Sequence, residues 1–283
     1  MGETDIVEII REALSGGQTA LSESEAKQFC ASLGIPVCRG VMAADVAAAV
    51  TAAIKLGFPV VLKAIGKDLF HKTEVRGIAL NLNGEEEVRQ EGCRLLGIPE
   101  SEALLVQEMV KGDRELVCGL VRDAQFGPCV MFGLGGVLTE VLQDVVFRVA
   151  PLTLWDAREM VKEIQHGKIL EPFRGEVAVD LDVLSRVLVT LGEIGVKYQE
   201  VQSVDINPLK IQPDGQPVAV DALVTLGAGK PTVLGELKKT FRRNDLARFF
   251  EPESVAVIGA SAMSGKAGYV VVKNILANGY AGK

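Results

Sequence analysis

Residues 58–80 read FPVVLKAIGKDLFHKTEVRGIAL, and this stretch indicates how the rest of the chain is organised. Residues 59–62 form a continuous apolar run, which is typical of a strand buried on both faces, and the run ends at Lys63. A cationic loop follows and ends at Gly77, after which residues 78–82 have the pattern of a returning strand. The loop contains Lys67, His71, Lys72 and Arg76. A lysine that leaves a buried strand beside such a loop predicts a pocket for an anion.

The same stretch also has a purely structural interpretation. Lys63 can bury its aliphatic part at the strand end and extend its ammonium group to solvent, with the loop as a solvated run of charge. His71 is one of only two histidines in the sequence, the other being His166. A single histidine in a loop is more often a surface residue than a catalyst, so the rest of the sequence has to decide.

The composition predicts an α/β protein. A chain of 283 residues with 48% hydrophobic content can form more than one core, and strands alternate with helical patterns. The net charge of −7 argues against nucleic acid as a main partner. The five cysteines show no C-x-x-C spacing, so we expect reduced core residues rather than disulfides or a zinc site. The sequence shows neither a signal peptide nor an apolar segment of membrane-spanning length, so we expect a cytoplasmic protein without membrane contact.

Capping signals divide the first part of the chain into short elements. Ser22 and Glu25 match a capping box, and Asp45 and Asn83 stand at the starts of two further helical patterns. The expected elements are helices over residues 5–14, 22–34, 45–56 and 83–96, and strands over residues 37–42, 59–62 and 78–82.

The middle of the chain contains a glycine cluster at a strand end. We expect strands over residues 103–109, 115–121 and 128–132, and the last of these enters Gly-Leu-Gly-Gly at residues 133–136. Such junctions let a backbone approach a phosphate, although a plain tight turn is the alternative. Packing helices are expected over residues 153–164 and after Asp180.

Residues 201–224 predict a β-hairpin whose turn is Pro213-Asp214-Gly215. Asn207 and Asp221 are equally distant from the turn, which places them opposite each other on one face, with Cβ atoms about 4.5–5.5 Å apart. A carboxylate beside an amide oxygen suits magnesium better than zinc. A shift of register by one residue would separate the pair, and the alternative is an ordinary turn-proximal Asn and a strand-end Asp.

The end of the chain has a Rossmann-like pattern. Residues 227–250 are predicted to be a linker. Residues 254–268, SVAVIGASAMSGKAG, read as a strand over residues 255–258 and a glycine turn before an apolar helix over residues 269–276. A helix N-terminus of this kind suits a pyrophosphate. The pattern departs from G-x-G-x-x-G, so NAD is not implied. We expect only the first βα unit of such a domain.

The Lys63 strand, the glycine junction, the paired oxygen ligands and the Rossmann-like pattern occur in this order along the chain. Together they resemble the ADP-forming acyl-CoA synthetases, relatives of succinyl-CoA synthetase, whose nucleotide half is an ATP-grasp domain. The resemblance extends over residues 19–226. It rests on LSESEAKQFCASLGIPV, on residues 58–80, on VQEMVKGDRELVCGLVRDAQFGPCVMFGLGGVLTEVLQDVVFRVAPL and on VDINPLKIQPDGQPVAVDA. The segment EPESVAVIGASAMSGKAGYVVVKNIL looks like the start of the family's CoA-binding domain.

The resemblance implies roles for individual residues. Lys63 would hold nucleotide phosphates, Glu115 would lie near the ribose or the phosphates, and Gly135 and Gly136 would offer backbone N–H groups to phosphate. The adenine hinge would comprise Gln107, Glu108, Met109 and Val110. Asn207 and Asp221 match the family's magnesium ligands, and Gly259 and Ser261 fall in the CoA-binding segment. His71 matches a histidine thought to relay phosphate between the main phosphohistidine and ADP.

The resemblance also implies an α/β fold, namely a two-lobed ATP-grasp fold followed by a truncated Rossmann-like βα unit. The expected parts are an N-terminal helix (1–17), an ATP-grasp domain (18–226, with lobes of about 18–105 and 106–226), a linker (227–250) and an incomplete CoA-binding domain (251–283). The cofactors would be ATP or ADP, Mg²⁺ and CoA. We expect turnover to require a CoA-ligase domain or an α-type subunit, in a hetero- or homo-oligomer.

Two other functions stay open on the sequence. One is an ATP-grasp ligase that makes an acyl phosphate directly and does not need His71. The other is a non-catalytic nucleotide- or CoA-sensing module of a fused protein acetyltransferase. The joint presence of His71, Lys63, Asn207 and Asp221 argues against a decayed site.

Overall fold

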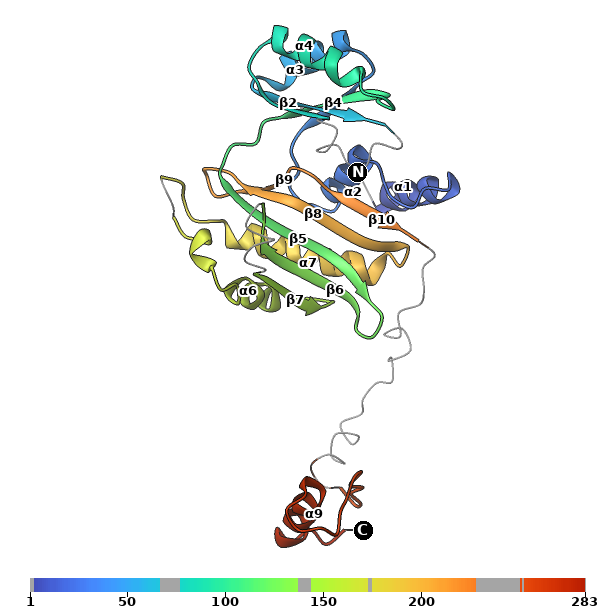
Figure 1. The fold of residues 1–283 in the computed structure, drawn as a ribbon, viewed down its shortest axis with the longest axis vertical. Helices are drawn as coiled ribbons and strands as arrows, with labels where there is room; N and C mark the ends of the chain where they lie inside the picture. Colours follow the sequence, from blue (N-terminus) through green and yellow to red (C-terminus); the bar gives the residue numbers. More distant parts are fainter. Residues whose placement is uncertain are drawn as a thin grey trace. The chain divides into compact units, whose positions relative to one another are not determined.

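A computed structural model describes residues 3–66, 77–136, 144–172, 175–227, 250 and 252–282. It divides into two compact units, Met1–Thr232 and Val233–Lys283. The first unit contains two sheets (Figure 1), and every ladder between their named strands is antiparallel. We call residues 40–108 the small lobe and the other described residues up to 227 the large lobe.

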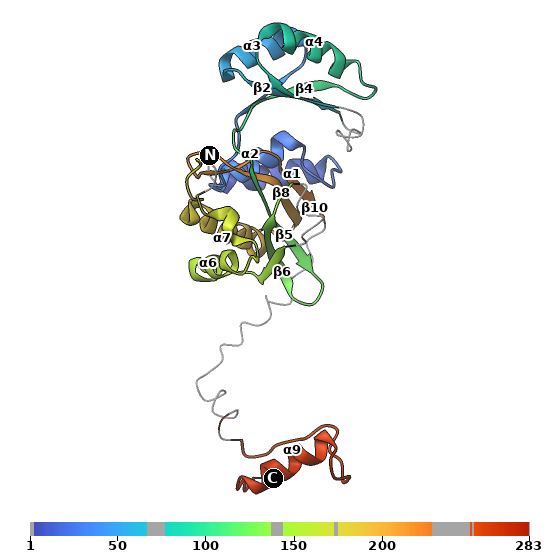
Figure 2. The ribbon, with the colours of Figure 1, turned by 60° about the vertical axis from the view of Figure 1, so that its left-hand side comes forward.

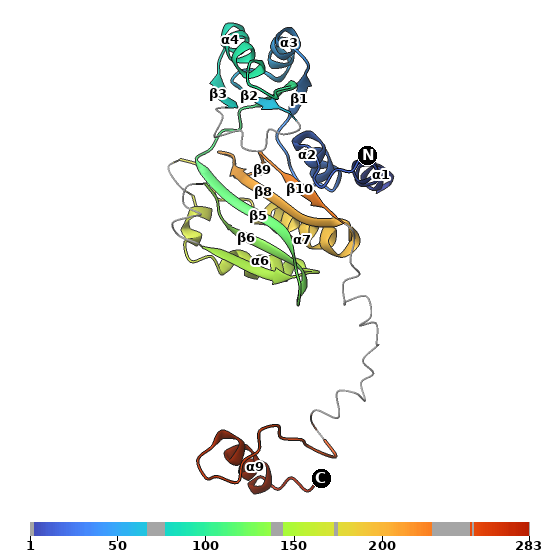
Figure 3. The same cartoon turned by 45° about the vertical axis from the view of Figure 1, so that its right-hand side comes forward.

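The small lobe is a four-stranded sheet in the order β1-β4-β2-β3, with two helices on one face (Figure 3). Its elements are β1 (Gly40–Ala43), α3 (Val46–Leu56), β2 (Val60–Ile65), β3 (Ile78–Leu82), α4 (Glu85–Leu96) and β4 (Ala103–Glu108). Leu62 and Ala64 of β2 belong to the apolar cluster beneath the helices. Because side chains alternate along a strand, Lys63 points away from that cluster, toward the large lobe.

The large lobe is a six-stranded sheet in the order β10-β8-β5-β6-β7, with β9 paired to β8. Its strands are β5 (Arg114–Asp123), β6 (Gly127–Leu134), β7 (Val145–Val149), β8 (Val201–Ile211), β9 (Pro217–Ala219) and β10 (Leu223–Leu226). Its helices are α1 (Glu3–Ser15), α2 (Glu23–Ser32), α6 (Leu154–Lys162), the short 3₁₀ helix η1 (Gly167–Leu170) and α7 (Leu181–Lys197). Helices α6 and α7 lie along one face of the sheet (Figure 2).

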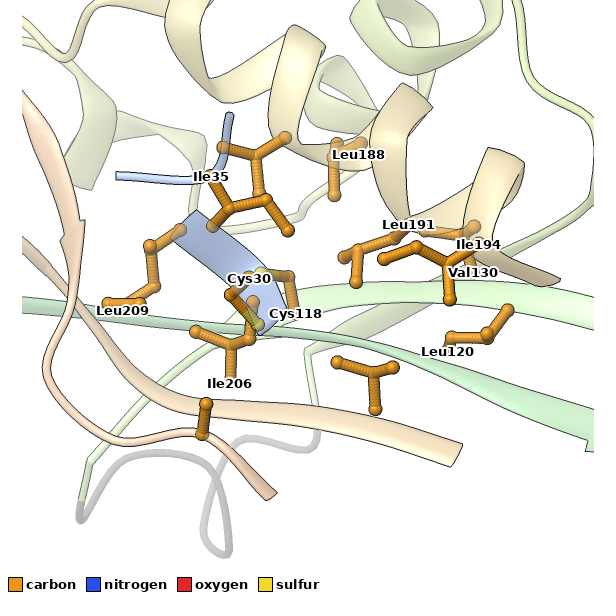
Figure 4. Close-up of a cluster of buried hydrophobic side chains, with 14 of the residues drawn as sticks. Cys30, Ile35, Cys118, Leu120, Val130, Leu188, Leu191, Ile194, Ile206 and Leu209 are labelled. Carbon is orange, nitrogen blue, oxygen red and sulfur yellow. The ribbon is translucent and has the colours of Figure 1, made fainter. Parts of the chain in front are cut away.

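The core of the large lobe lies between this sheet and its helices. Leu188, Leu191 and Ile194 form the inner stripe of α7 and pack toward Leu120 and Val130 of the sheet (Figure 4). All five side chains are buried. The stripe matches the helical spacing predicted from the sequence, so α7 is positioned by burial of its apolar face.

Most of the predicted helix caps are present. The Ser22 hydroxyl accepts the N–H of Glu25, and the Glu25 carboxylate accepts the N–H of Ser22, which completes the predicted capping box. Asp45 and Asp180 also cap the helices that follow them. Asn83 does not cap α4, because Gly84 is the N-cap and makes no side-chain cap bond.

The strand predicted over residues 37–42 is different in the structure, where β1 begins only at Gly40. Cys38 donates its N–H to the carbonyl of Ala219 at 2.9 Å, and Ala219 donates its own to Pro36 at 2.8 Å. The predicted strand is therefore divided, with one part bonded to the large sheet and one to the small sheet. Strands β5 and β6 are longer than predicted at both ends.

The chain crosses between the lobes at two neighbouring places. It enters the small lobe at Arg39 and leaves at Glu108. Arg39 donates its backbone N–H to Oε1 of Glu108 at 2.7 Å, and Glu108 donates its backbone N–H to the Arg39 carbonyl at 3.1 Å. The Arg39 guanidinium adds an ion pair to the same carboxylate at 2.7 Å. These bonds join the entering and leaving segments.

The second unit contains the helix α9 (Ala267–Ala277), close to the prediction. Residues 255–258 were predicted as a strand, and they form none, since the described part of this unit offers no neighbouring strand. The predicted linker lies mostly outside the described residues. None of the helices in the described part of the chain has the length and apolar character of a membrane span.

Candidate functional site

Lys63 is buried at a point where three separate elements meet. Its Nζ lies 2.6 Å from Oε1 of Glu23 in α2 and 3.3 Å from Oδ2 of Asp221, between β9 and β10. Only 6% of the Lys63 side chain is exposed. Burial alone would lower the pKa of Lys63, but the carboxylates of Asp221 and Glu23 outweigh it and raise the pKa. Lys63 is therefore a paired cation inside the protein, not a surface lysine.

Glu23 was not predicted as a site residue, because a glutamate in the first turn of a helix is ordinarily explained by the helix dipole. In the structure its carboxylate also lies 3.5 Å from Nζ of Lys27. The available sequence signal was the spacing of four residues between Glu23 and Lys27. That spacing predicts a pair but not its burial or its contact with Lys63.

The hairpin has the register expected from its turn. Ladder pairs on both sides keep one register, and continuing this register across residues 220–222, which are not in a strand, would bring position 221 opposite position 207. The flanking pairs are Asp205 with Leu223 and Leu209 with Ala219. Ile206 is buried in the core, so its neighbour Asn207 points to the other face of the sheet, where it is exposed.

Asp205 is a second residue that the sequence reasoning missed. It shares the face of Asn207, two residues away, and this period of two was the signal that could have identified it. Burial and the nearby Asp221 carboxylate raise the pKa of Asp205. Two carboxylates and one amide oxygen are ligands of the kind that hard cations prefer. The described residues contain no group of three His, Cys, Asp or Glu side chains suited to a metal, so this set depends on Asn207.

The predicted adenine hinge lies at the end of β4. Gln107 is buried, and its side-chain amide lies 3.2 Å from Sγ of Cys38 and donates to the carbonyl of Val220 at 3.3 Å. Within the described part of the chain, Oε1 of Gln107 has no hydrogen-bond partner. Met109 donates its N–H to Pro59 at 3.2 Å. A buried acceptor of this kind fits a ligand that brings a donor.

An apolar cluster and a cavity adjoin this hinge. Val110 packs with Cys38 and Val218. The cavity has a volume of about 300 Å³. Its lining comprises Ser24, Lys27, Gln28, Ala31, Val37, Cys38, Arg39, Gly40 and Leu105. Ser24, Lys27, Gln28 and Arg39 make about half of this lining polar, so the cavity is not the mostly apolar kind of pocket that is typical of small-molecule sites.

The glycine cluster lies against Glu115. Gly135 donates its N–H to the Glu115 carbonyl at 2.8 Å, so this N–H is engaged within the sheet. Gly136 has a positive φ of 66°, and a Cβ there would lie 2.6 Å from Oε2 of Glu115. Lys210 lies 3.7 Å from the same carboxylate. Both glycines follow the last ladder pair of β6, Leu116 with Leu134, and Gly135 continues the bonding to β5 by one residue before Gly136.

The structure does not place the remaining predicted residues relative to this site. His71 lies outside the described residues. Gly259 and Ser261 belong to the second unit, where Gly259 has a positive φ of 83° and the Ser261 hydroxyl accepts the N–H of Met263 at 3.1 Å. A Cβ at Gly268 would lie 2.0 Å from the Gly259 carbonyl oxygen, so the loop and the start of α9 pack without side chains between them.

The family model described as an ATP-grasp domain matches residues 12–226 of this sequence. The chain belongs to the ATP-grasp family. An ATP-grasp domain accounts for the two antiparallel sheets and for the mixed α and β composition. Both features agree with the predicted fold class.

Related ATP-grasp proteins are ADP-forming acid–CoA ligases. An acetate–CoA ligase (ADP-forming) II of Archaeoglobus fulgidus is 39% identical over 93% of this chain and 38% of its own length. The subunit beta of acetate–CoA ligase (ADP-forming) I from Pyrococcus furiosus is 37% identical over 77% of this chain and 97% of its own. The chain thus corresponds to the β-type part of these ligases and spans under two fifths of the Archaeoglobus relative.

A solved ATP-grasp structure is similar as well. It is an acetyl-coenzyme A synthetase 1 of Ca. Korarchaeum cryptofilum in complex with coenzyme A and Mg-AMPPCP, with its phosphohistidine segment pointing towards the nucleotide-binding site. The identity is 41% and the TM-score is 0.70, over 78% of this chain and 100% of that one.

Proposed function

We propose that this chain is the nucleotide-binding part of an ADP-forming acyl-CoA synthetase of the acetate–CoA ligase type. The observation that carries the proposal is the meeting of Lys63 from the small lobe with Asp221 from the large lobe, 3.3 Å apart. The Lys63 ammonium group is suited to phosphate and the Asp221 carboxylate to a divalent cation, so a metal-bound nucleotide would give each of them a partner. The relatives' names supply the reaction class.

The overall reaction would convert acyl-CoA, ADP and phosphate into the free acid, CoA and ATP, and would run in reverse. His71 would serve as a phosphoryl relay. A neutral ring nitrogen of His71 would attack the phosphorus of the main phosphohistidine, and the new N–P bond would form as the N–P bond to that histidine breaks and releases its imidazole. An oxygen of the ADP β-phosphate then takes the phosphoryl group, which frees the imidazole and yields ATP.

Each candidate residue has a part in this reaction. Bound Mg²⁺ would offset the charge of the phosphate oxygens during transfer. Asn207 and Asp221 would hold the cation, with Asp205 beside them. Lys63 would donate to the phosphates, and Gly136 would let its backbone approach them. The adenine would lie by Gln107, Glu108, Met109 and Val110, with Glu115 near the ribose or the phosphates.

The CoA chemistry would need more than the first unit. We assign residues 227–250 to a linker and residues 251–283 to the start of a CoA-binding domain, with Gly259 and Ser261 at the entry to α9. The Korarchaeum relative was solved with coenzyme A, and the Pyrococcus relative is named as a subunit beta. We therefore propose an α-type CoA-ligase partner, a multi-subunit assembly and a cytoplasmic location.

A phosphorylation assay tests this function. The full chain is incubated with γ-labelled ATP and Mg²⁺, with and without an α-type ligase subunit, and acid-labile, base-stable label is measured in wild type, His71→Ala and His166→Ala. We expect label in wild type and His166→Ala and none in His71→Ala. Nucleotide binding with no label under either condition would instead favour direct acyl-phosphate formation or a sensor.

A further inference from the structure

Glu23 is shared by two buried lysines. Its Oε1 lies 2.6 Å from Nζ of Lys63 and 3.5 Å from Nζ of Lys27, and the three side chains are each 6% exposed. Among the described residues, this group of two ammonium groups and one carboxylate carries one net positive charge. Asp221, whose side chain is 41% exposed, lies at the open side of this group. The Asp221 carboxylate offsets this charge, at 3.3 Å from Nζ of Lys63.

The helix to which Glu23 belongs does not require this arrangement. The start of α2 is already capped by Ser22 and Glu25, which exchange hydrogen bonds in a complete capping box. Glu23 points instead into the protein, where a buried carboxylate is costly unless cations accompany it. Its position is explained by the lysines rather than by the helix.

We propose that Glu23 is the positioning residue for Lys63, and that Lys27 preserves a positive charge there for a nucleotide phosphate. An ammonium group has three donors. Glu23 takes one at 2.6 Å and holds Nζ in place, while the longer 3.3 Å contact to Asp221 is the one that phosphate replaces. Because Lys27 shares Glu23, the carboxylate does not neutralise Lys63 completely. This inference rests on the proposed function, in which Lys63 binds phosphate.

Asp221 then has two successive partners. Asp221 pairs with Lys63 in the structure, and it would turn to the divalent cation on binding of the metal-bound nucleotide. Glu23 and Lys27 keep their places throughout, because both are buried and paired with each other. The alternative is that Glu23 only ties α2 to β2 and has no effect on the phosphate site.

Nucleotide affinity in a mutant cycle separates these two possibilities. The full chain is titrated with Mg·ADP, using NMR where binding is weak, for wild type, Glu23→Gln, Lys63→Met and the double variant. We expect Glu23→Gln to weaken Mg·ADP binding at least tenfold in the wild-type background. In the Lys63→Met background, adding Glu23→Gln should not change the affinity further. Such non-additivity indicates action through Lys63. An equal loss in both backgrounds would overturn the inference.

Glu25→Gln is the matched control. It removes a carboxylate from the same helical turn, and glutamine can still complete the capping box. We expect wild-type affinity, and a loss equal to that of Glu23→Gln would refute the positioning role. Adenosine, which has no phosphate, should bind wild type and Glu23→Gln alike, whereas a general structural defect would weaken both ligands.

Glu23→Asp covers the case in which Glu23→Gln does not fold. It keeps the charge but withdraws the carboxylate by one methylene group, so we expect a folded protein with severalfold weaker Mg·ADP binding. Wild-type affinity in this variant would show that the position of the carboxylate does not matter. If wild type itself did not bind Mg·ADP, the proposed function would fail together with this inference. Normal wild-type binding with an unaffected Glu23→Gln would refute the inference alone.

Discussion

Gln107 donates its side-chain amide to the carbonyl oxygen of Val220 at 3.3 Å, and this bond joins the end of the small sheet to the segment between β9 and β10. The other polar atom of the same side chain, Oε1, is buried without a partner among the described residues. A buried acceptor without a donor lowers stability, and a ligand that supplies the donor recovers that free energy.

This acceptor predicts a base preference. The 6-amino group of adenine can donate to Oε1 of Gln107, whereas the 6-oxo group of hypoxanthine cannot. We expect ADP to bind about tenfold more tightly than IDP, as one neutral hydrogen bond allows. In Gln107→Leu the difference between the two ligands should nearly vanish. Calorimetric titration measures both constants, and an unchanged ratio in the variant would contradict the assignment.

Because Asp205 lies near the Asp221 carboxylate, removing its charge should have opposite effects on two properties: stability should rise and Mg²⁺ affinity should fall. Asp205 has a raised pKa, so its ionised form destabilises the metal-free fold above the ordinary aspartate value. Because Asp205 is exposed and water screens its repulsion from Asp221, we expect Asp205→Asn to raise the Tm at pH 7 by less than about 1 °C, a gain that shrinks as the pH falls toward about 4. The same change should weaken Mg²⁺ binding about tenfold. A lower Tm with unchanged Mg²⁺ affinity would show that Asp205 is only structural.

Asp144 anchors the turn before η1 and predicts a pH dependence of stability. Its buried carboxylate accepts the backbone N–H groups of Gln165 at 3.0 Å and His166 at 2.8 Å, and it lies 2.9 Å from Nδ1 of the His166 ring. Burial would raise the pKa of Asp144, but these bonds outweigh it and lower the pKa. The ionised Asp144 carboxylate therefore contributes to the stability of the fold above the ordinary aspartate pKa, and this contribution is lost as the pH falls through the lowered pKa.

We accordingly expect Asp144→Asn to lower the free energy of unfolding by about 1–2 kcal/mol at pH 7. The difference from wild type should diminish below about pH 4. Urea unfolding at several pH values measures it. The exposed Asp182, which pairs with Arg158, is the control, and Asp182→Asn should change stability by less than about 0.5 kcal/mol. A difference that stayed constant down to pH 3 would argue against the carboxylate as its cause.

Gly136 and Gly34 form a matched pair of glycines. Both have positive φ, 66° and 84°, but only Gly136 lies against another side chain, the Glu115 carboxylate. Alanine at either position should lower stability by about 1–2 kcal/mol through the backbone alone. Only Gly136→Ala must also displace Glu115, so we expect it to weaken Mg·ADP binding severalfold while Gly34→Ala does not. Equal affinities in the two variants would remove Glu115 and Gly136 from the nucleotide site.

The sequence was most informative where the deciding interactions are local. The cap formed by Ser22 and Glu25 depends on two residues that are three positions apart. The hairpin register depends on a turn that lies within residues 201–224 themselves. The pairing of Lys63 was not predictable in this way. Its partners Glu23 and Asp221 lie 40 and 158 positions away in the sequence. Only the folded arrangement of the two lobes brings them together.

The wrong strand over residues 37–42 has a related cause. The sequence pattern correctly indicates extended backbone, but it does not indicate which sheet supplies the hydrogen-bonding partners of each residue. Cys38 bonds to the large sheet and Gly40 begins a strand of the small sheet. The strand expected over residues 255–258 was wrong for a simpler reason, because a strand needs a neighbour and the described second unit provides none.

The bonds between Arg39 and Glu108 have a consequence for how such proteins can evolve. The small lobe is entered and left at one place, and its apolar cluster is separate from that of the large lobe. Residues 40–108 thus form a cassette. A recombination event could exchange this cassette for that of a relative through two junctions that lie side by side, one after Arg39 and one after Glu108, without repacking the apolar cluster of the large lobe.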